Sequence, residues 1–150
     1  MCRIYLLVLG ILLLCSFWSC KKTREYGVIT GEWRFNSAYM NHTSTNILDV
    51  VLPYHATNPE NCYYQIIYEN DGTVYGNYYT YDTLNYFVVG KWHLIKYDLV
   101  YLQLDQYVNG IFNVEDEGNG NLKLTSNSDS NTVEYLGSIK AYVEMNVHRE

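Results

Sequence analysis

Side chains that commonly do chemistry are spread through this sequence without the spacing that a familiar reaction needs. The four histidines, His42, His55, His93 and His148, stand far apart and have no spacing typical of a zinc site. The sequence contains no Gly-x-Ser-x-Gly nucleophile motif, no phosphate-binding loop, no His-Glu-x-x-His and no paired-cysteine metal motif. We therefore predict a protein that is not an enzyme and that has no metal site and no cofactor.

Charge excludes a further class of partner. The 150 residues include 10 Lys and Arg against 16 Asp and Glu, which gives a net charge of −6. A chain that binds nucleic acid normally carries an excess of positive charge, because phosphates dominate that affinity. We therefore expect no nucleic-acid partner.

Cys20 follows a segment that directs export. The run Ile4–Cys15 is apolar, which suits the core of a signal peptide but is shorter than the roughly 20 residues that span a bilayer. Ser19 lies directly before Cys20, and this resembles the lipobox of bacterial lipoproteins, in which a small residue precedes the lipidated cysteine. The rival Cys15 follows the bulky Leu14. An ordinary secretory signal or a short membrane anchor is the alternative.

The lipoprotein resemblance implies a division of the chain and a location. Residues 1–19 would be the signal peptide, residues 20–29 the lipidated Cys20 with a tether, and residues 30–150 the folded domain. Lipoproteins that Bacteroidota export to the cell surface carry acidic residues after the cysteine, whereas this chain has Lys21-Lys22-Thr23-Arg24. We therefore expect an outer-membrane protein that is held by acylated Cys20 and faces the periplasm.

The folded domain has the pattern of an all-β protein. The sequence holds 17 tyrosines and many β-branched residues, which favour strands. Turn signals such as Asn70-Asp71-Gly72, Asn109-Gly110 and Gly118-Asn119-Gly120 separate alternating segments. About eight strands joined by short hairpins favour an antiparallel up-and-down barrel, because closure removes exposed edges.

Alternation also predicts which side chains share a face. Trp33, Phe35 and Tyr39 are expected on one face of the first strand. Residues 47–52 are capped by Asn46 and read as a short helix or a strand. Residues 40–61 form a longer connection than a hairpin needs, and such segments either cover a binding site as a lid or plug the end of a barrel.

Two tryptophan motifs resemble those of a known family. Thr30-Gly31-Glu32-Trp33 opens the first strand and Gly90-Lys91-Trp92 lies inside a later one, a pattern similar to the lipocalins and to small lipocalin-like lipoproteins of Bacteroidota. The resemblance implies that Trp33, with Gly31 before it, closes the base of the barrel beneath a stacked basic side chain. Lys140 and Arg149 are the two candidates for that base.

The tyrosines allow two functions. We expect Tyr64, Tyr68, Tyr78 and Trp92 to face the interior and to bind a small apolar ligand, which is the function that the resemblance favours. Tyr63, Tyr75 and Tyr79 face the other way, and as an exposed platform they would bind a glycan or a periplasmic protein instead. Core packing and cross-strand pairing alone would also explain the excess of tyrosine.

One modification signal remains. Asp82-Thr83-Leu84 looks like the Asp-Ser/Thr-apolar motif of O-glycosylation in Bacteroides, and it falls in an expected turn. The hypothesis is a sugar on Thr83, which the intact mass of the native protein tests.

Overall fold

The computed structural model describes residues 27–52, 54–104, 108–127, 133–135 and 139–150. The chain divides into two units, residues 1–30 and residues 31–150. In the first unit, residues 27–29 form one helical turn. Cys20 and the expected signal peptide lie outside the described residues. Among the residues that are described, no helix is both long and apolar enough to cross a membrane.

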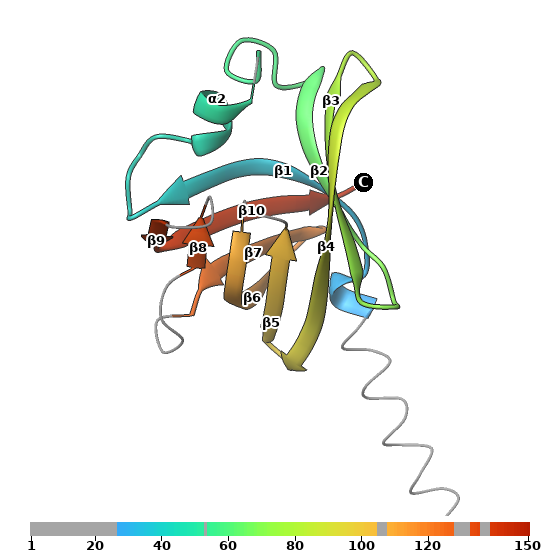
Figure 1. Cartoon of the computed structure of the whole chain (residues 1–150), viewed down its shortest axis with the longest axis vertical. Helices are drawn as coiled ribbons and strands as arrows, with labels where there is room; N and C mark the ends of the chain where they lie inside the picture. Colours follow the sequence, from blue (N-terminus) through green and yellow to red (C-terminus); the bar gives the residue numbers. More distant parts are fainter. Residues whose placement is uncertain (1–26, 53, 105–107, 128–132, 136–138) are drawn as a thin grey trace, which may run out of the picture. The chain divides into compact units, whose positions relative to one another are not determined.

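The second unit is an antiparallel barrel of eight strands with a short helix and a small hairpin (Figure 1). Strands β1 to β7 pair in sequence order, β5 also pairs with β6, and β10 lies between β7 and β1 and closes the barrel. The predicted all-β, up-and-down, lipocalin-like barrel class is therefore confirmed. The elements are β1 (Gly31–Met40), α2 (Ile47–Val51), β2 (Cys62–Tyr68), β3 (Thr73–Thr80), β4 (Thr83–Lys96), β5 (Leu99–Leu104), β6 (Val108–Gly118), β7 (Asn121–Ser126), β8 (Val133–Tyr135), β9 (Ile139–Ala141) and β10 (Val143–Arg149).

The small hairpin consists of β8 and β9 and lies in the connection between β7 and β10. Strand β8 pairs with Val108 and Asn109 of β6, whereas β7 pairs with β6 from Phe112 onward. Strand β8 therefore continues the line of β7 along β6. Strand β9 pairs with β8 and leads, after Tyr142, into β10.

Glycine-containing turns reverse the chain where the sequence predicts them. Between β2 and β3, Gly72 has a φ of 89°, and the Asp71 carboxylate accepts a hydrogen bond from the Thr73 backbone N–H at 2.8 Å. Gly118 and Gly120 have φ values of 79° and 78° between β6 and β7. These positive angles favour glycine, which explains why the two turns are readable from sequence.

The predicted hairpin turn at Asn109-Gly110 is wrong. Both residues lie within β6, where Asn109 pairs with Gln103 and Gly110 pairs with Leu102 of β5. The Tyr101 hydroxyl donates a hydrogen bond to the side-chain oxygen of Asn109 at 2.9 Å. Asn-Gly permits a tight turn but does not require one, and here the pairing of two apolar strands decides the register.

The face of Tyr39 is also different from the prediction. The register of β1 against β10 shifts between Phe35 and Ser37, so one extra residue enters β1. Beyond this bulge Ala38 points inward and is buried, while Tyr39 is half-buried on the outer side. A bulge inverts the alternation that follows it, and the sequence carries no glycine or proline to mark this one.

The barrel interior holds one continuous apolar core. Each large apolar side chain that is fully buried contributes about 1.5–3 kcal/mol to the free energy of unfolding. Among the described residues Cys62 is the one cysteine, and it is free and buried, so the stability of the domain comes from this packing. The core side chains on the strands include Trp33, Phe35, Ile66, Val74, Trp92, Val100, Leu102, Phe112, Leu122, Leu124, Met145 and Val147.

The segment between β1 and β2 covers one end of the barrel. Helix α2 begins at its Asn46 cap, whose side-chain oxygen accepts hydrogen bonds from the backbone N–H groups of Ala38 and Leu48. Leu48 and Leu52 are buried. The other end of the segment is tied to the β3–β4 turn, because the Tyr81 N–H donates to the Asn61 carbonyl at 2.7 Å. The open choice between helix and strand is therefore settled as helix.

Candidate binding site

Trp33 is buried in the barrel interior, and a basic side chain lies over its ring. The Trp33 side chain is 2% exposed, and the Arg149 guanidinium carbon lies 4.7 Å from its ring centroid. Arg149 is also the residue opposite Trp33 in the β1–β10 register. Gly31, two residues earlier, has a φ of 121°, a backbone conformation that glycine adopts at no steric cost.

Tyr68 and Trp92 pack on each other inside the same part of the barrel. Their rings meet edge to face at 5.3 Å, and both side chains are almost fully buried. The Trp92 indole N–H donates to the Glu69 carbonyl at 2.8 Å. Burial raises the pKa of the Tyr68 phenol above its ordinary value. These two side chains are therefore already covered by the chain's own core.

Tyr64 and Tyr78 lie on the inner face nearer to the end that α2 covers. Tyr64 is half-buried and packs edge to face on Phe35 at 5.3 Å, while Tyr78 is 2% exposed and lies 5.2 Å from the Tyr86 ring. A Cβ atom at Gly76 would overlap the Tyr64 hydroxyl. The Tyr64 ring thus fills the space that this glycine leaves open. Of the four predicted ligand-binding residues, only Tyr64 keeps appreciable exposure.

The outer face of β2, β3 and β4 presents three cross-strand rows of side chains. We call the nine residues of these three rows the outer β2–β4 face. The register aligns them as rows in which neighbouring side chains lie about 4.5–5.5 Å apart at Cβ. The rows are Tyr63–Tyr79–Leu84, Gln65–Asn77–Phe87 and Ile67–Tyr75–Val89.

The part of this face on β2 and β3 is aromatic and polar. Tyr63 and Tyr79 stack at 5.2 Å with 20° between their planes, and the Arg34 guanidinium carbon lies 4.0 Å above the Tyr63 ring. The Gln65 amide donates to a carboxylate oxygen of Glu150 at 2.7 Å. Burial and then the negative charge of Glu150 raise the pKa of the Tyr63 phenol, while Arg34 lowers it. Polar groups on this side are therefore largely satisfied within the chain.

The part of the face on β4 is apolar and exposed. Phe87 is 60% exposed, Val89 51% and Leu84 45%. Residue pattern alone does not select them, because Phe87 and Val89 belong to an almost continuous apolar run from Tyr86 to Ile95 and Leu84 stands in the expected turn motif Asp82-Thr83-Leu84. The available signal was that an antiparallel barrel normally alternates, so the outward half of such a run should have been polar. Single exposed apolar residues are ordinary, but neighbouring ones on one strand indicate a binding surface.

A hollow lies on the outer side of β1 and β10. It has a volume of about 430 Å³ and is lined by Tyr39, His42, Thr43, Ser44, Tyr142 and Glu144. The rings of His42 and Tyr142 stack at 4.2 Å. The Glu144 carboxylate is paired with Lys123 at 3.2 Å and so already has a cationic partner.

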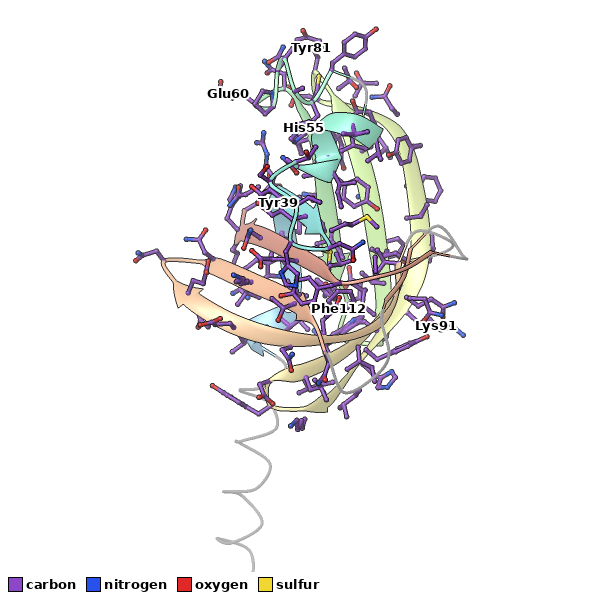
Figure 2. All side chains as sticks on the ribbon, turned by 90° about the vertical axis from the view of Figure 1, so that its left-hand side faces the viewer. Tyr39, His55, Glu60, Tyr81, Lys91 and Phe112 are labelled. Carbon is purple, nitrogen blue, oxygen red and sulfur yellow. The ribbon has the colours of Figure 1, made fainter. Side chains whose placement is uncertain are left out.

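Buried polar groups elsewhere form pairs rather than clusters. His55 is 4% exposed, and its Nδ1 lies 2.7 Å from an Asp49 carboxylate oxygen of α2 (Figure 2). Within the described part of the chain, no three His, Cys, Asp or Glu side chains are arranged to hold a metal ion.

The comparisons with known proteins found no match for this chain. No protein-family model matches the chain, and no curated protein or solved structure matches it significantly.

Proposed function

We propose that this protein is a binding module of the bacterial cell envelope, and that it recognises another protein through the outer β2–β4 face. The observation that carries the proposal is the exposure of Phe87, Val89 and Leu84 on one strand. Burying apolar surface contributes roughly 25 cal/mol per Å², so a partner that covers these side chains gains affinity from them directly.

The chemistry of the face favours a protein over a glycan. A glycan needs polar groups free to bind its hydroxyls, whereas Gln65 and Asn77 are nearly buried and hydrogen-bonded to neighbouring side chains. The most exposed side chains are apolar instead. Protein interfaces place aromatic and aliphatic residues at their centre and charged ones at the rim.

A small apolar ligand on the inner face is the second candidate. The observation in its favour is that Tyr64 is half-buried, and that Tyr86, which packs on buried Tyr78, is 37% exposed. A ligand would have to contact these two rings. It could not lie deeper in the barrel, because Tyr68 and Trp92 pack on each other there. This hypothesis keeps the lipocalin-like function but moves it to the end that α2 covers.

The proposal includes the lipid anchor. Acylation of Cys20, supported by Ser19 before it and by the apolar run before that, would hold the domain on the periplasmic face of the outer membrane. More than one acyl chain makes such an anchor stable, where a single chain gives only marginal binding. Membership of the lipocalin-like lipoproteins of Bacteroidota is part of the same proposal.

Site-directed photo-crosslinking in the native cells tests the proposed surface. A photoreactive amino acid at position 87 is expected to give a covalent adduct of defined mass. The matched control is position 97, since Tyr97 is 70% exposed but lies in the β4–β5 turn outside the outer β2–β4 face. Equal yields at the two positions, or no adduct at position 87, would contradict the proposal.

Native mass spectrometry of the protein from its own membranes tests the anchor and the second candidate. Acyl mass on Cys20 is expected. A further small-molecule mass that is lost in the Tyr86→Ala variant would shift the function to the inner face. A chain without acyl groups would overturn the proposed location.

A further inference from the structure

The hollow on the outer side of β1 and β10 combines aromatic rings with hydroxyl groups. Its volume of about 430 Å³ lies within the range of roughly 300–1,000 Å³ for sites that hold small molecules. The rings of Tyr39, His42 and Tyr142 line it, together with two hydroxyl side chains and one carboxylate. None of these six residues belongs to the outer β2–β4 face, so the hollow is a separate surface of the barrel.

A β-bulge turns Tyr39 toward this hollow. The register of β1 against β10 shifts between Phe35 and Ser37, and beyond the shift Tyr39 lies opposite Glu144 on the outer side, near the end of β1 (Figure 2). Without the extra residue, alternation along β1 would point the Tyr39 ring into the core. Bulges are common beside active sites, where they change the direction of a side chain.

A strained turn places His42 beside Tyr142. Asn41 and His42 follow β1 with φ angles of 50° and 59°, a conformation that residues other than glycine adopt at a cost in free energy. The Thr43 N–H closes the turn by donating to the Met40 carbonyl at 2.9 Å. Such strain persists only where the surroundings hold it, and it is concentrated at functional sites.

The surroundings that hold this turn come from Tyr142. The Asn41 N–H donates to the Tyr142 carbonyl at 2.8 Å, and the Tyr142 N–H donates to the Asn41 side-chain oxygen at 3.1 Å. The His42 and Tyr142 rings stack at 4.2 Å with 23° between their planes. Two segments that are a hundred residues apart in the chain therefore form one fixed aromatic wall.

The hydroxyl groups of the hollow are available to a ligand. Among the described residues, the side-chain hydroxyls of Tyr39, Thr43 and Ser44 have no hydrogen-bond partner. Thr43 and Ser44 are exposed, and Tyr39 is half-buried. On the outer β2–β4 face, by contrast, Gln65 and Asn77 are nearly buried and bonded to neighbouring side chains.

The charge in the hollow is balanced. The Glu144 carboxylate lies 3.2 Å from the Lys123 ammonium, and this contact raises the pKa of Lys123, so the pair is ionised at neutral pH. A neutralised carboxylate attracts a cation weakly and gives an anion no favourable contact. It still has acceptor capacity, because a carboxylate has about four lone-pair sites.

We propose that this hollow binds a sugar ring. A pyranose presents C–H groups on one face, which pack against aromatic rings because the ring faces are electron-rich. Its hydroxyls exchange hydrogen bonds with hydroxyl and carboxylate groups around it. The three rings supply the first kind of contact, and Thr43, Ser44 and Glu144 supply the second. A wholly apolar ligand would leave those polar groups without partners.

This site goes beyond the proposed protein interface, and the two fail separately. Photo-crosslinking at position 87 reports on the outer β2–β4 face alone. Sugar binding at the hollow neither requires nor excludes a protein on that face.

Saturation-transfer NMR on the full chain tests the site, in a detergent whose head group carries no sugar. The probes are the methyl glycosides of glucose, galactose, mannose and N-acetylglucosamine at millimolar concentration. We expect transfer to the ring C–H protons of at least one of them. Absence of transfer to all of these probes would overturn the inference.

Variants of one ring locate the bound sugar. Tyr142→Ala should weaken the affinity for the sugar about fivefold, whereas Tyr142→Phe keeps the ring and should stay within twofold of the wild type. The matched control is Tyr79→Ala, because Tyr79 is also half-buried and stacks on Tyr63 of the outer β2–β4 face. A loss with Tyr79→Ala in place of Tyr142→Ala would put the sugar on that other face and contradict the site.

A second pair of variants tests the carboxylate. Glu144→Gln should weaken binding about threefold, because charge-assisted hydrogen bonds to the sugar hydroxyls are lost. Glu115→Gln is the control, since Glu115 lies opposite Lys123 in the β6–β7 register but does not line the hollow. Equal losses in the two variants would contradict a direct contact between Glu144 and the sugar.

A titration with a longer ligand distinguishes a free sugar from a glycan chain. The tetrasaccharide of the sugar that binds should have at least tenfold higher affinity than its methyl glycoside if the natural ligand is a chain. Equal affinities indicate a free sugar. Either result supports the site when Tyr142→Ala weakens both ligands, and unchanged affinities in that variant would overturn it.

Discussion

The inner and outer faces of β2–β4 use the same residue types for opposite purposes. On the inner face, Tyr68 and Trp92 pack together and are 3% and 2% exposed, whereas on the outer face Phe87 is 60% exposed. Alternation along a strand decides which residue goes to which face, and the neighbouring strands then decide what covers it. A tyrosine-rich sheet of this kind therefore builds a buried core and an exposed apolar face from adjacent residues.

The most direct test of this difference between the two faces is to truncate one aromatic residue on each face. Trp92→Ala should cost about 3–5 kcal/mol of unfolding free energy, because it leaves a cavity in the core and removes the donor to the Glu69 carbonyl. Phe87→Ala should change stability by less than about 0.5 kcal/mol. Urea unfolding of both variants measures the difference, and similar losses for the two would show that the outer face is also structural.

Gly90 is expected to give the next largest effect, because the backbone of β5 at Gln103 and Leu104 lies directly against it. Gly90→Ala should destabilise the barrel by about 1–3 kcal/mol, since the new Cβ would overlap the Gln103 carbonyl. The control is Val89→Ala, one residue away with its side chain on the exposed face. Thermal unfolding compares them, and an unaffected Gly90→Ala variant would mean that β5 does not approach β4 so closely.

The basic side chain over Trp33 should have a smaller effect. Arg149→Ala removes the cation above Trp33 and is expected to cost about 0.5–1 kcal/mol, the range for an exposed cation–π contact. Lys96→Ala is the control, because Lys96 is an exposed cation whose 3.9 Å pair with Asp98 contributes little. The midpoints of denaturant unfolding of the two variants measure the difference. Equal shifts of the midpoint would contradict a stabilising contact between Arg149 and Trp33.

The smallest expected effect is a pH dependence that comes from the buried phenol of Tyr68. Burial raises the folded pKa of Tyr68, so its contribution is complete below the ordinary phenol pKa of 10.0 and is lost as pH rises above it. At about pH 10, where half of the unfolded phenols are ionised, the loss is about 0.4 kcal/mol. Tyr68→Phe should remove it, whereas Tyr97→Phe, at an exposed turn, should not.

Local rules made a large part of this fold readable from sequence. Gly72 in the β2–β3 turn and Gly118 and Gly120 in the β6–β7 turn have the positive φ angles that their sequence contexts predict. The inward face of the last strand, with Val143, Met145 and Val147, is also as alternation predicts. These features depend on a few neighbouring residues, so the sequence contains what decides them.

The candidate site was harder to predict, because its exposure depends on how β4 is placed against its neighbours and not on its own residue types. Phe87 and Val89 belong to a run that is typical of a strand buried on both faces. Only the register of β4 against β3, which turns their side chains outward, makes them a surface. No local property of these two residues distinguishes them from core residues.

What the sequence determined by itself was the all-β class, the glycine turns and the alternation of inward and outward side chains, since each follows from short-range backbone and solvation preferences. Tertiary structure decided the bulge that turns Tyr39 outward, the placement of Asn109-Gly110 inside β6, the position of Arg149 over Trp33 and the exposure of Phe87 and Val89. Each of these depends on which strands pair and where their pairing ends, and that balance is settled by packing across the whole barrel.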